Sequence, residues 1–346
     1  MKKLTIGSAA FDDFEGVYFT YQSLRLANID RLDELDLVLI DNNPSSPEGR
    51  ATEDFCSKAG IRYFPEPIPR STAIRDRVFR VAEAPFTLCI DSHVLFEPET
   101  ISHCLDFAEG EGSESSDLFH GAMLYDYLGE ENPATHLDPV WRDNMFGIWG
   151  HDERALDKEG EPFEIPSQGL GLFGCRTEAW AGFSPLFQGF GGEEGYIHEK
   201  FRQRGDKVWC LPWLRWVHRF ARPRGNTYPL NIEERIRNYT FGWLELGKEL
   251  EEIREHFEEL HPRVPVSKIM EDAEEIFRRW EEEPQIAIEL IHGEKEKERS
   301  GLHQRAEKKG VEVWNDTEIR FGSPLEIEIL EKLLRIERLS LKWSVR

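Results

Sequence analysis

The stretch Phe86-Thr87-Leu88-Cys89-Ile90-Asp91-Ser92-His93 joins a short, mostly apolar run to two side chains that can bind a metal. Such a run is typical of a strand buried inside a covered sheet. Asp91 and His93 follow it two residues apart, and in an extended chain residues i and i+2 point to the same side. A carboxylate and an imidazole could therefore share one divalent cation. The alternative is that Asp91 belongs to a turn and His93 is an ordinary surface residue.

Strand-like and helix-like patterns alternate on the N-terminal side of this stretch. The hydrophobic spacing predicts strands over residues 4–9, 35–40 and 61–64, and helices over residues 17–26, 53–58 and 72–82. This alternation indicates an α/β fold with a mostly parallel central sheet flanked by helices. Ligands bind outside the carboxyl ends of the strands in such sheets, which is where Asp91 and His93 lie.

The C-terminal side of the stretch is less regular. Residues 129–164 are rich in Gly, Pro, Asp, Asn and Trp, and we expect an irregular excursion over the active site. Further elements are predicted as a strand over 117–127, a glycine-dense segment over 169–174, short helices over 177–181 and 195–203, and a strand over 207–211.

Composition limits the classes of function. The chain has 346 residues, and 43 Lys and Arg against 66 Asp and Glu give a net charge of -23. This charge argues against binding to nucleic acid or to an anionic membrane. The five scattered cysteines fit a reducing compartment. No signal peptide and no apolar run of about 18 residues is evident, so we expect a soluble, cytoplasmic protein.

The composition changes near Leu230. Residues 232–299 are helical in pattern and rich in Glu, and Ser323-Pro324 marks the start of a last amphipathic helix. We therefore predict two parts: an α/β domain over residues 1–228 and a mostly helical C-terminal region over residues 229–346. We interpret the helical region as a solvated packing appendage, which could also join two copies in a homo-oligomer.

Two nucleotide-binding motifs are absent from the start of the chain. The first predicted strand continues into Gly7-Ser8-Ala9-Ala10-Phe11, which is neither GxGxxG nor the phosphate-binding GxxxxGK[ST]. A nucleotide would have to be held by acidic and aromatic groups instead.

Several short motifs, in the right order over roughly residues 3–228, resemble the catalytic domain of the polypeptide N-acetylgalactosaminyltransferases, which have the GT-A fold. Ile74-Arg75-Asp76-Arg77, followed by Ile90-Asp91-Ser92-His93, resembles that family's helix with paired arginines and its Asp-x-His metal motif. The Asp-Ser-His sequence also resembles the motif of the cytoplasmic N-acetylglucosaminyltransferases that modify hydroxyproline. Bacterial and phage family-2-like transferases share the same scaffold.

The remaining motifs lie further along the chain. Gly169–Phe173 and Phe190-Gly191-Gly192-Glu193-Glu194 resemble the family's Gly-Gly-Leu-Phe and Trp-Gly-Gly-Glu-Asn segments. Trp209–Pro212, followed by Val217–Phe220, resembles the strand and third metal-ligand histidine. Phe190 and Glu194 stand where the family has Trp and Asn, which leaves the donor sugar open.

The resemblance implies a role for each matched residue. Asp91, His93 and His218 are expected to bind one Mn²⁺ or Mg²⁺, because carboxylate, imidazole and phosphate oxygen suit these ions. Glu193 and Glu194 are the candidate catalytic residues at the start of a helix, where carboxylates are also favoured electrostatically. Donor contacts are expected from Asp41, Arg75, Ser92, Gly171, Gly192, Arg219, Arg222 and Arg224.

The implied activity is a metal-dependent transfer of a hexose or N-acetylhexosamine from a UDP-sugar to a hydroxyl acceptor, with retention. In that reaction the acceptor attacks from the leaving-group side and the diphosphate takes its proton. The alternatives are an inverting family-2-like transferase with Glu193 or Glu194 as general base, a nucleotidyltransferase, and an inactive nucleotide-sugar-binding module. A protein, a glycan, a small molecule or a hydroxylated base could each be the acceptor.

Overall fold

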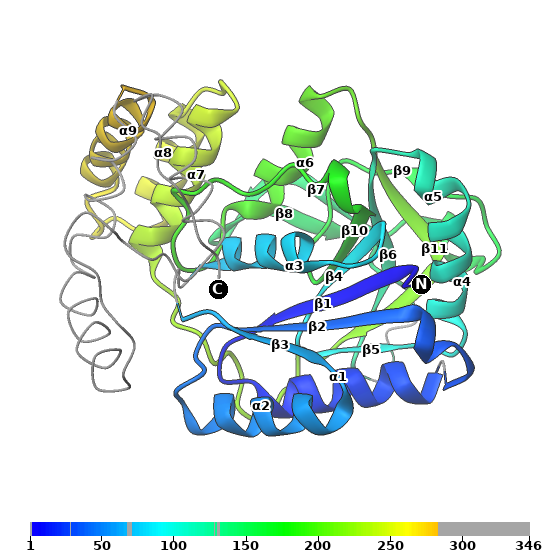
Figure 1. The fold of residues 1–346 in the computed structure, drawn as a ribbon. Coiled ribbons are helices and arrows are strands. Elements are labelled where there is room, and N and C mark those ends of the chain that lie inside the picture. The colour runs from blue at the N-terminus through cyan, green and yellow to red at the C-terminus, as the bar shows by residue number, and fades with distance from the viewer. Residues whose placement is uncertain (1, 28, 68–70, 128, 130–131, 283–346) are drawn as a thin grey trace, which may run out of the picture.

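The structure is a computed structural model that describes residues 2–27, 29–67, 71–127, 129 and 132–282. At its centre is a mostly parallel sheet in the order β3-β2-β1-β4-β10-β6-β11-β5 (Figure 1). Its strands are β1 (Leu4–Ala10), β2 (Leu35–Asp41), β3 (Arg62–Pro65), β4 (Phe86–Asp91), β5 (Val94–Phe96), β6 (Leu118–Tyr125), β10 (Leu172–Arg176) and β11 (Val208–His218), with β9 (Phe163–Glu164) beside β11. Only β5, β9 and β10 run against the common direction of these strands. The prediction of a mostly parallel sheet is confirmed.

Helices cover both faces of the sheet. They are α1 (Phe14–Ala27), α2 (Pro47–Ala59), α3 (Asp76–Val81), α4 (Thr100–Glu109), α5 (Glu111–Glu114) and α6 (Glu193–Gln203), with 3-10 turns at Ile29–Glu34, Thr72–Arg75, Glu153–Leu156 and Thr177–Ala179. Strand β4 shows how the two faces arise. Leu88 and Ile90 join the core cluster under α1, α2 and α4, whereas Cys89 joins the cluster under α3 and α6. Successive side chains of β4 thus point to opposite faces of the sheet, and both faces are covered by helices. The result is a three-layer α/β/α arrangement.

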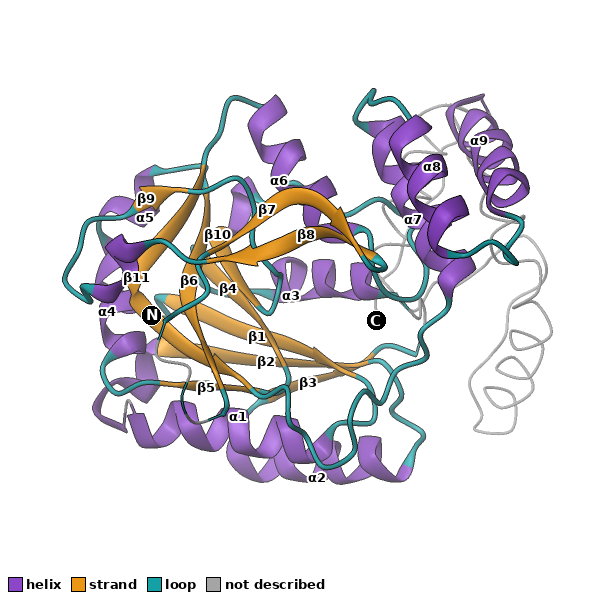
Figure 2. Cartoon of the chain, turned by 180° about the vertical axis from the view of Figure 1, so that it is seen from behind, coloured by secondary structure: helices purple, strands orange, loops and turns teal. Residues whose placement is uncertain are grey.

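The region that we expected to be an irregular excursion contains a hairpin instead. Strands β7 (His136–Arg142) and β8 (Met145–Gly150) form a separate two-stranded sheet (Figure 2). Their two-residue turn is Asp143-Asn144, in which Asp143 adopts a left-handed φ of 49° that Asp and Asn tolerate. The prediction of irregular structure was therefore wrong for this hairpin, because the Gly, Pro and Trp content hid the Asp-Asn turn signal.

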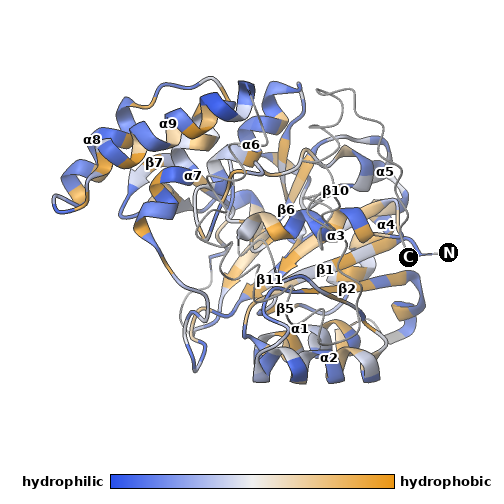
Figure 3. Ribbon diagram, turned by 60° about the vertical axis from the view of Figure 1, so that its left-hand side comes forward, coloured by the Kyte–Doolittle hydropathy of each residue, from blue (hydrophilic) through white to orange (hydrophobic). Residues whose placement is uncertain are grey.

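The C-terminal helices are α7 (Ile232–Glu245), α8 (Glu251–Leu260) and α9 (Val266–Glu282). Ile236, Tyr239 and Trp243 of α7 form a core cluster with residues of α8 and α9, while hydrophilic residues follow the outer sides of α8 and α9 (Figure 3). The helix predicted to begin at Ser323 lies outside the described residues. Within those residues, we find no helix with the length and apolar character needed to cross a membrane.

Candidate active site

The short strand β5 brings the two ends of the site together. Asp91 ends β4 and His218 ends β11, but β10 and β6 lie between these strands in the sheet. After the turn that follows β4, the chain enters β5, which pairs with β11 so that Val94 lies opposite His218. The N–H of Arg219 then donates to the carbonyl oxygen of His93 at 3.1 Å. The pairing of β5 with β11 therefore places His93 beside His218.

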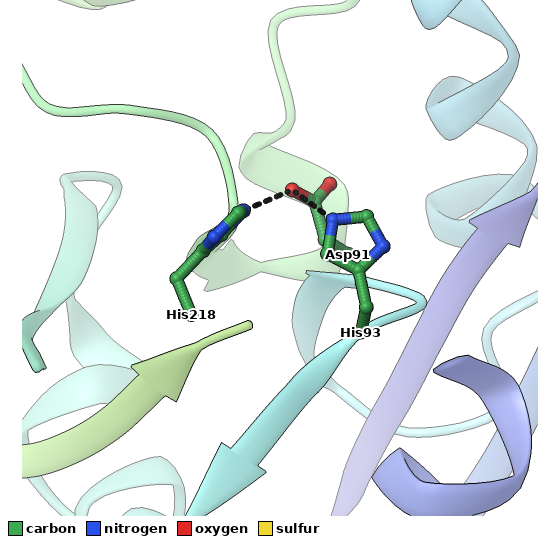
Figure 4. A group of neighbouring side chains, drawn as sticks. All are labelled: Asp91, His93 and His218. Atoms are coloured by element: carbon green, nitrogen blue, oxygen red, sulfur yellow. Dashed lines mark ion pairs between the residues drawn. The ribbon is translucent and has the colours of Figure 1, made fainter. Parts of the chain in front are cut away.

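Asp91, His93 and His218 converge on one point (Figure 4). Asp91 Oδ2 lies 3.8 Å from His93 Nε2 and 3.6 Å from His218 Nε2, and one ligand atom from each residue lies within 4.8 Å of the others. Ligand atoms about 2.1 Å from a shared ion lie roughly 3–4 Å from one another. The two distances from Asp91 and the donor set of one oxygen and two nitrogens thus fit a divalent cation such as Mn²⁺.

The conformation at Ser92 and His93 differs from the extended chain that we assumed. Both residues form a turn, so the argument from side chains i and i+2 was wrong. Helix α1 fixes this turn: the buried Thr20 hydroxyl lies 3.0 Å from Ser92 O and 2.8 Å from Val94 O, and accepts from the Val94 N–H at 2.9 Å. The turn still directs Asp91 and His93 to the same point.

Electrostatics favour the ligand forms of Asp91 and His218. Burial by itself raises the pKa of Asp91, but the hydrogen bond with His218 and the nearby His93 and Arg75 more than reverse this and lower it. Burial lowers the pKa of His218. An ionised carboxylate and a neutral imidazole are the forms that a metal binds. His218 Nδ1 is buried and has no hydrogen-bond partner among the described residues.

These three side chains line a cavity of about 1290 Å³. Of the other predicted site residues, Arg75, Ser92, Gly171, Glu194 and Arg222 also line it, whereas Asp41, Gly192, Glu193, Arg219 and Arg224 do not. A Cβ atom on Gly171 would lie 2.7 Å from the Trp216 ring and 3.3 Å from Asp91 Oδ2. Glycine at this position therefore keeps the space beside the Asp91 carboxylate open.

Arg75, which lines the cavity, forms a buried pair with Glu193, which does not line it. Arg75 Nη2 lies 3.0 Å from Glu193 Oε1, while Nη1 donates to Leu170 O and Nε to Thr72 O. Arg75 thus links the 3-10 turn Thr72–Arg75, the glycine-rich segment and the start of α6. Glu193 is fully buried, and its second oxygen has no hydrogen-bond partner in the described part of the chain.

Glu194 differs from its neighbour because it faces the cavity. Burial, and secondly the carboxylate of Glu193, raise the pKa of Glu194 well above its ordinary value. It can therefore carry a proton near neutral pH and donate a hydrogen bond to a ligand in the cavity, or accept a proton after losing its own.

The three predicted arginines after His218 have separate surroundings. Arg219 binds Glu15 at 2.7 Å, and the exposed Arg224 pairs with Glu48. Arg222 faces the cavity, and its Nε and Nη1 groups are buried without a partner among the described residues. Arg219 Nη1 is also buried without a partner among these residues, but of the three arginines only Arg222 lines the cavity, where its free donors could meet an anionic ligand.

Asp41 is enclosed by its own neighbours. Its oxygens accept from the Tyr63 hydroxyl at 2.8 Å and from the Asn43 N–H at 2.9 Å, and burial raises its pKa. The adjacent Asn42, rather than Asp41, reaches the cavity lining.

Other cavity residues were not predicted. Asp13, Trp149 and Tyr228 line the cavity, and Tyr228 stacks on Phe190 with ring centroids 4.7 Å apart. Asp13 could have been found, because it follows β1, the parallel neighbour of β4. Tyr228 could not, since it lies in a loop without a local pattern.

The helical region also reaches the cavity. Residues from α7 and α9 are among those that line it: Glu233, Glu234, Arg237, Phe241, Asp272, Glu275, Ile276 and Arg279. The buried Asn238 side chain accepts from the Gln188 N–H and donates to Gln188 O and Gly191 O. The helices therefore help to form the cavity and hold the loop that precedes Glu193. Our interpretation of this region as a solvated packing appendage did not include such a role.

No family model and no curated protein matches the chain by sequence. Among solved structures, it is similar to GalNAc-T7 with UDP, GalNAc and Mn²⁺, with a TM-score of 0.56 and 17% identity over 84% of this chain and 58% of that one. S. aureus TarS 1–349 in complex with UDP-GlcNAc aligns with a TM-score of 0.46 and 13% identity over 75% of this chain and 71% of that one. The first likeness shows that this chain has the GT-A fold.

Proposed function

We propose that this chain is a metal-dependent glycosyltransferase that moves a hexose or N-acetylhexosamine from a UDP-sugar to a hydroxyl acceptor with retention. The observation that carries the proposal is the convergence of Asp91, His93 and His218 at the wall of a large cavity in a GT-A fold. The similar GalNAc-T7 structure, which contains UDP, GalNAc and Mn²⁺, supports it.

Asp91, His93 and His218 would hold the metal, with Mn²⁺ or Mg²⁺ as the candidates. When bound, such an ion acts as a Lewis acid that neutralises charge on a departing diphosphate. Arg222 would bind phosphate oxygens through its two unpartnered N–H groups, because guanidinium groups suit paired contacts with phosphate. Asp41, Ser92, Gly171 and Gly192 remain proposed donor contacts, directly or through the backbone beside them.

The proposal gives the two glutamates different tasks. Glu193 would hold Arg75 in place beneath the donor, because each neutralises the other in a buried pair. Glu194 would hydrogen-bond the sugar from the cavity wall. In a retaining reaction the donor diphosphate takes the acceptor proton, so no protein base is required. In an inverting reaction Glu194, which faces the cavity, would be the general base.

A donor screen tests this proposal. UDP-sugars are incubated with the protein with and without Mn²⁺, and UDP release and thermal shift are measured. We expect Mn²⁺-dependent UDP release with one donor, and its loss in Asp91→Ala. Donor binding that is independent of Mn²⁺ and of Asp91, with no UDP release, would indicate an inactive binding module. Release of pyrophosphate would indicate a nucleotidyltransferase.

The product anomer separates the two transferase mechanisms. With an α-linked donor, NMR of the product should show an α-linkage. A β-linkage would contradict retention and would assign the general base role to Glu194.

A further inference from the structure

Asp13 lies behind His93, on the side of the ring away from the metal point. Its Oδ2 atom is 2.8 Å from His93 Nδ1 and accepts from the Ser92 hydroxyl at 2.7 Å. A carboxylate can only accept, so the proton between Asp13 and His93 must sit on Nδ1. When the ring is neutral, its Nε2 atom carries the lone pair, and it is this atom that faces Asp91.

The Asp13 carboxylate is held in place from the other side as well. Its Oδ1 atom accepts from the Gly16 N–H at 3.2 Å, and its backbone carbonyl accepts from Val17 at 3.0 Å, so Asp13 also caps the N-terminus of α1. A Cβ atom on Gly16 would lie 2.4 Å from Asp13 Oδ2. The absence of a side chain at position 16 therefore makes room for the carboxylate.

Charge agrees with this geometry. Burial by itself raises the pKa of Asp13, but the hydrogen bond with His93, the attraction of that ring when it is protonated, and the hydrogen bond from Ser92 more than offset burial and lower the pKa. Asp13 is thus an ionised acceptor next to His93. The hydroxyl of Ser92, a proposed donor contact, is directed to Asp13 instead.

We propose that Asp13 is a positioning residue that fixes the tautomer and orientation of His93 for binding a divalent cation, and that Gly16 is the glycine that admits its carboxylate. The inference rests on the metal centre of the proposed function. It extends that site to α1, because one carboxylate has two tasks. Asp13 Oδ1 caps the helix, and Asp13 Oδ2 orients the His93 ring. Partners of this kind behind a ligand histidine typically change metal affinity by about 10–100-fold.

Asp13→Asn is the sharpest variant. Asn caps helices about as well as Asp, so its amide oxygen can keep the Gly16 contact. Its amide nitrogen would then face His93 Nδ1 and donate to it, which forces the proton of the ring onto Nε2. We expect Mn²⁺ affinity, measured by EPR without donor, to fall about 10–100-fold. Thermal unfolding should change little.

The tautomer is measured directly by long-range ¹H–¹⁵N NMR of the histidine rings in the metal-free protein, with His93→Gln to assign the signals. We expect Nδ1–H in the wild type and Nε2–H in Asp13→Asn. A purely structural role for Asp13 would not change this signature. Asp12→Asn is the matched control, because Asp12 is adjacent, carries the same charge and accepts from Asn43 rather than from His93.

Gly16→Ala is the second variant and removes no charge. Ala favours helix by about 1 kcal/mol over Gly, yet its Cβ would displace the Asp13 carboxylate. We expect Mn²⁺ affinity to fall several-fold while the melting temperature changes little, because the helix preference of Ala offsets the lost contact between Asp13 and the Gly16 N–H. If Asp13→Asn does not fold, Gly16→Ala still tests whether Asp13 positions His93.

The outcomes separate this inference from the proposed function. An Nε2–H tautomer in the wild type, or equal Mn²⁺ affinity and equal tautomers in wild type and Asp13→Asn, overturns the role of Asp13 while the metal centre stands. A tautomer switch in a protein that binds no Mn²⁺ supports the positioning of His93 and contradicts the metal centre.

Discussion

The described part of the chain contains two close pairs of histidines that are built differently. His93 and His218 lie at the cavity with ring centroids 5.1 Å apart and planes nearly perpendicular at 89°. His120 of β6 and His198 of α6 lie inside the core, 4.9 Å apart and stacked at 26°. Both members of the inner pair are fully buried. Similar distances between rings therefore occur in two very different chemical settings.

The difference is the partner of each ring. In the cavity pair, both Nε2 atoms face the Asp91 carboxylate. In the inner pair, the Nδ1 atoms face the carbonyl oxygens of Leu172 and Glu194, and the Nε2 atoms lie 2.9 Å from each other.

Backbone contacts define the inner pair. The Gln168 N–H also donates to His198 Nε2. The inner pair thus ties the glycine-rich segment to the start of α6. Among the described residues, only Asp91, His93 and His218 form a converging group of ligands. A carboxylate, not the proximity of two imidazoles, distinguishes the candidate metal site.

Removing the carboxylate should give the largest effect. Asp91→Asn would leave two imidazoles around a neutral amide, so we expect Mn²⁺ binding to be lost and kcat/KM for transfer to fall by roughly 10³-fold, the scale of a metal's contribution to charge stabilisation. Mn²⁺ titration by EPR and UDP-release kinetics measure this. Asp138→Asn is the control, because Asp138 lies 3.5 Å from His136 at an exposed position. Undiminished Mn²⁺ binding in Asp91→Asn would mean that the carboxylate is not what distinguishes the cavity pair from the inner pair.

Disrupting the inner pair should affect stability instead. His120→Asn can keep the hydrogen bond to Leu172 O, but it leaves a void and removes one of the two neighbours of His198 Nε2, of which the Gln168 N–H remains. We expect a loss of about 2–4 kcal/mol in the free energy of unfolding, measured in urea, and Mn²⁺ affinity within about threefold of the wild type. A stable variant with much weaker Mn²⁺ binding would show that the inner pair belongs to the metal site.

The sequence predicted the cavity pair better than the inner one, for physical reasons. A strand that ends in Asp91-Ser92-His93 is a local pattern, and the alternation around it correctly predicted the sheet. The contact between His93 and His218 depends on β5 pairing with β11, which joins residues more than a hundred positions apart and leaves no local signal.

The inner pair and Asp13 were hidden for related reasons. His120 and His198 each lie in an apolar pattern of their own, and nothing in either pattern indicates that the two rings meet. Asp13 was visible only as a polar residue after a strand. Its role depends on the side of the His93 ring that it contacts, which a sequence pattern does not specify.

Acid should weaken the fold through the inner pair. Burial lowers the pKa of both His120 and His198 below the unfolded value of about 6.5. Below that pH the unfolded chain binds more protons than the folded one, so stability should fall as pH decreases. The slope is at most about 1.4 kcal/mol per pH unit for each histidine. Urea unfolding of the metal-free protein at pH 7, 6 and 5 measures it, and His120→Asn should reduce the slope by up to one proton. An unchanged slope would mean that other groups dominate.

We expect the smallest effect on Mn²⁺ affinity from a change beside the backbone turn at Ser92 and His93. Thr20→Val removes the hydroxyl that contacts Ser92 O, Val94 O and the Val94 N–H. The turn keeps its hydrogen bond from Arg219 N–H to His93 O and the side-chain contact of His93 with Asp13. Because one hydrogen bond contributes about 0.5–1.5 kcal/mol, we expect Mn²⁺ affinity to fall only two- to tenfold. A loss as large as that of Asp91→Asn would mean that the backbone turn, rather than the carboxylate between the rings, separates the cavity pair from the inner pair.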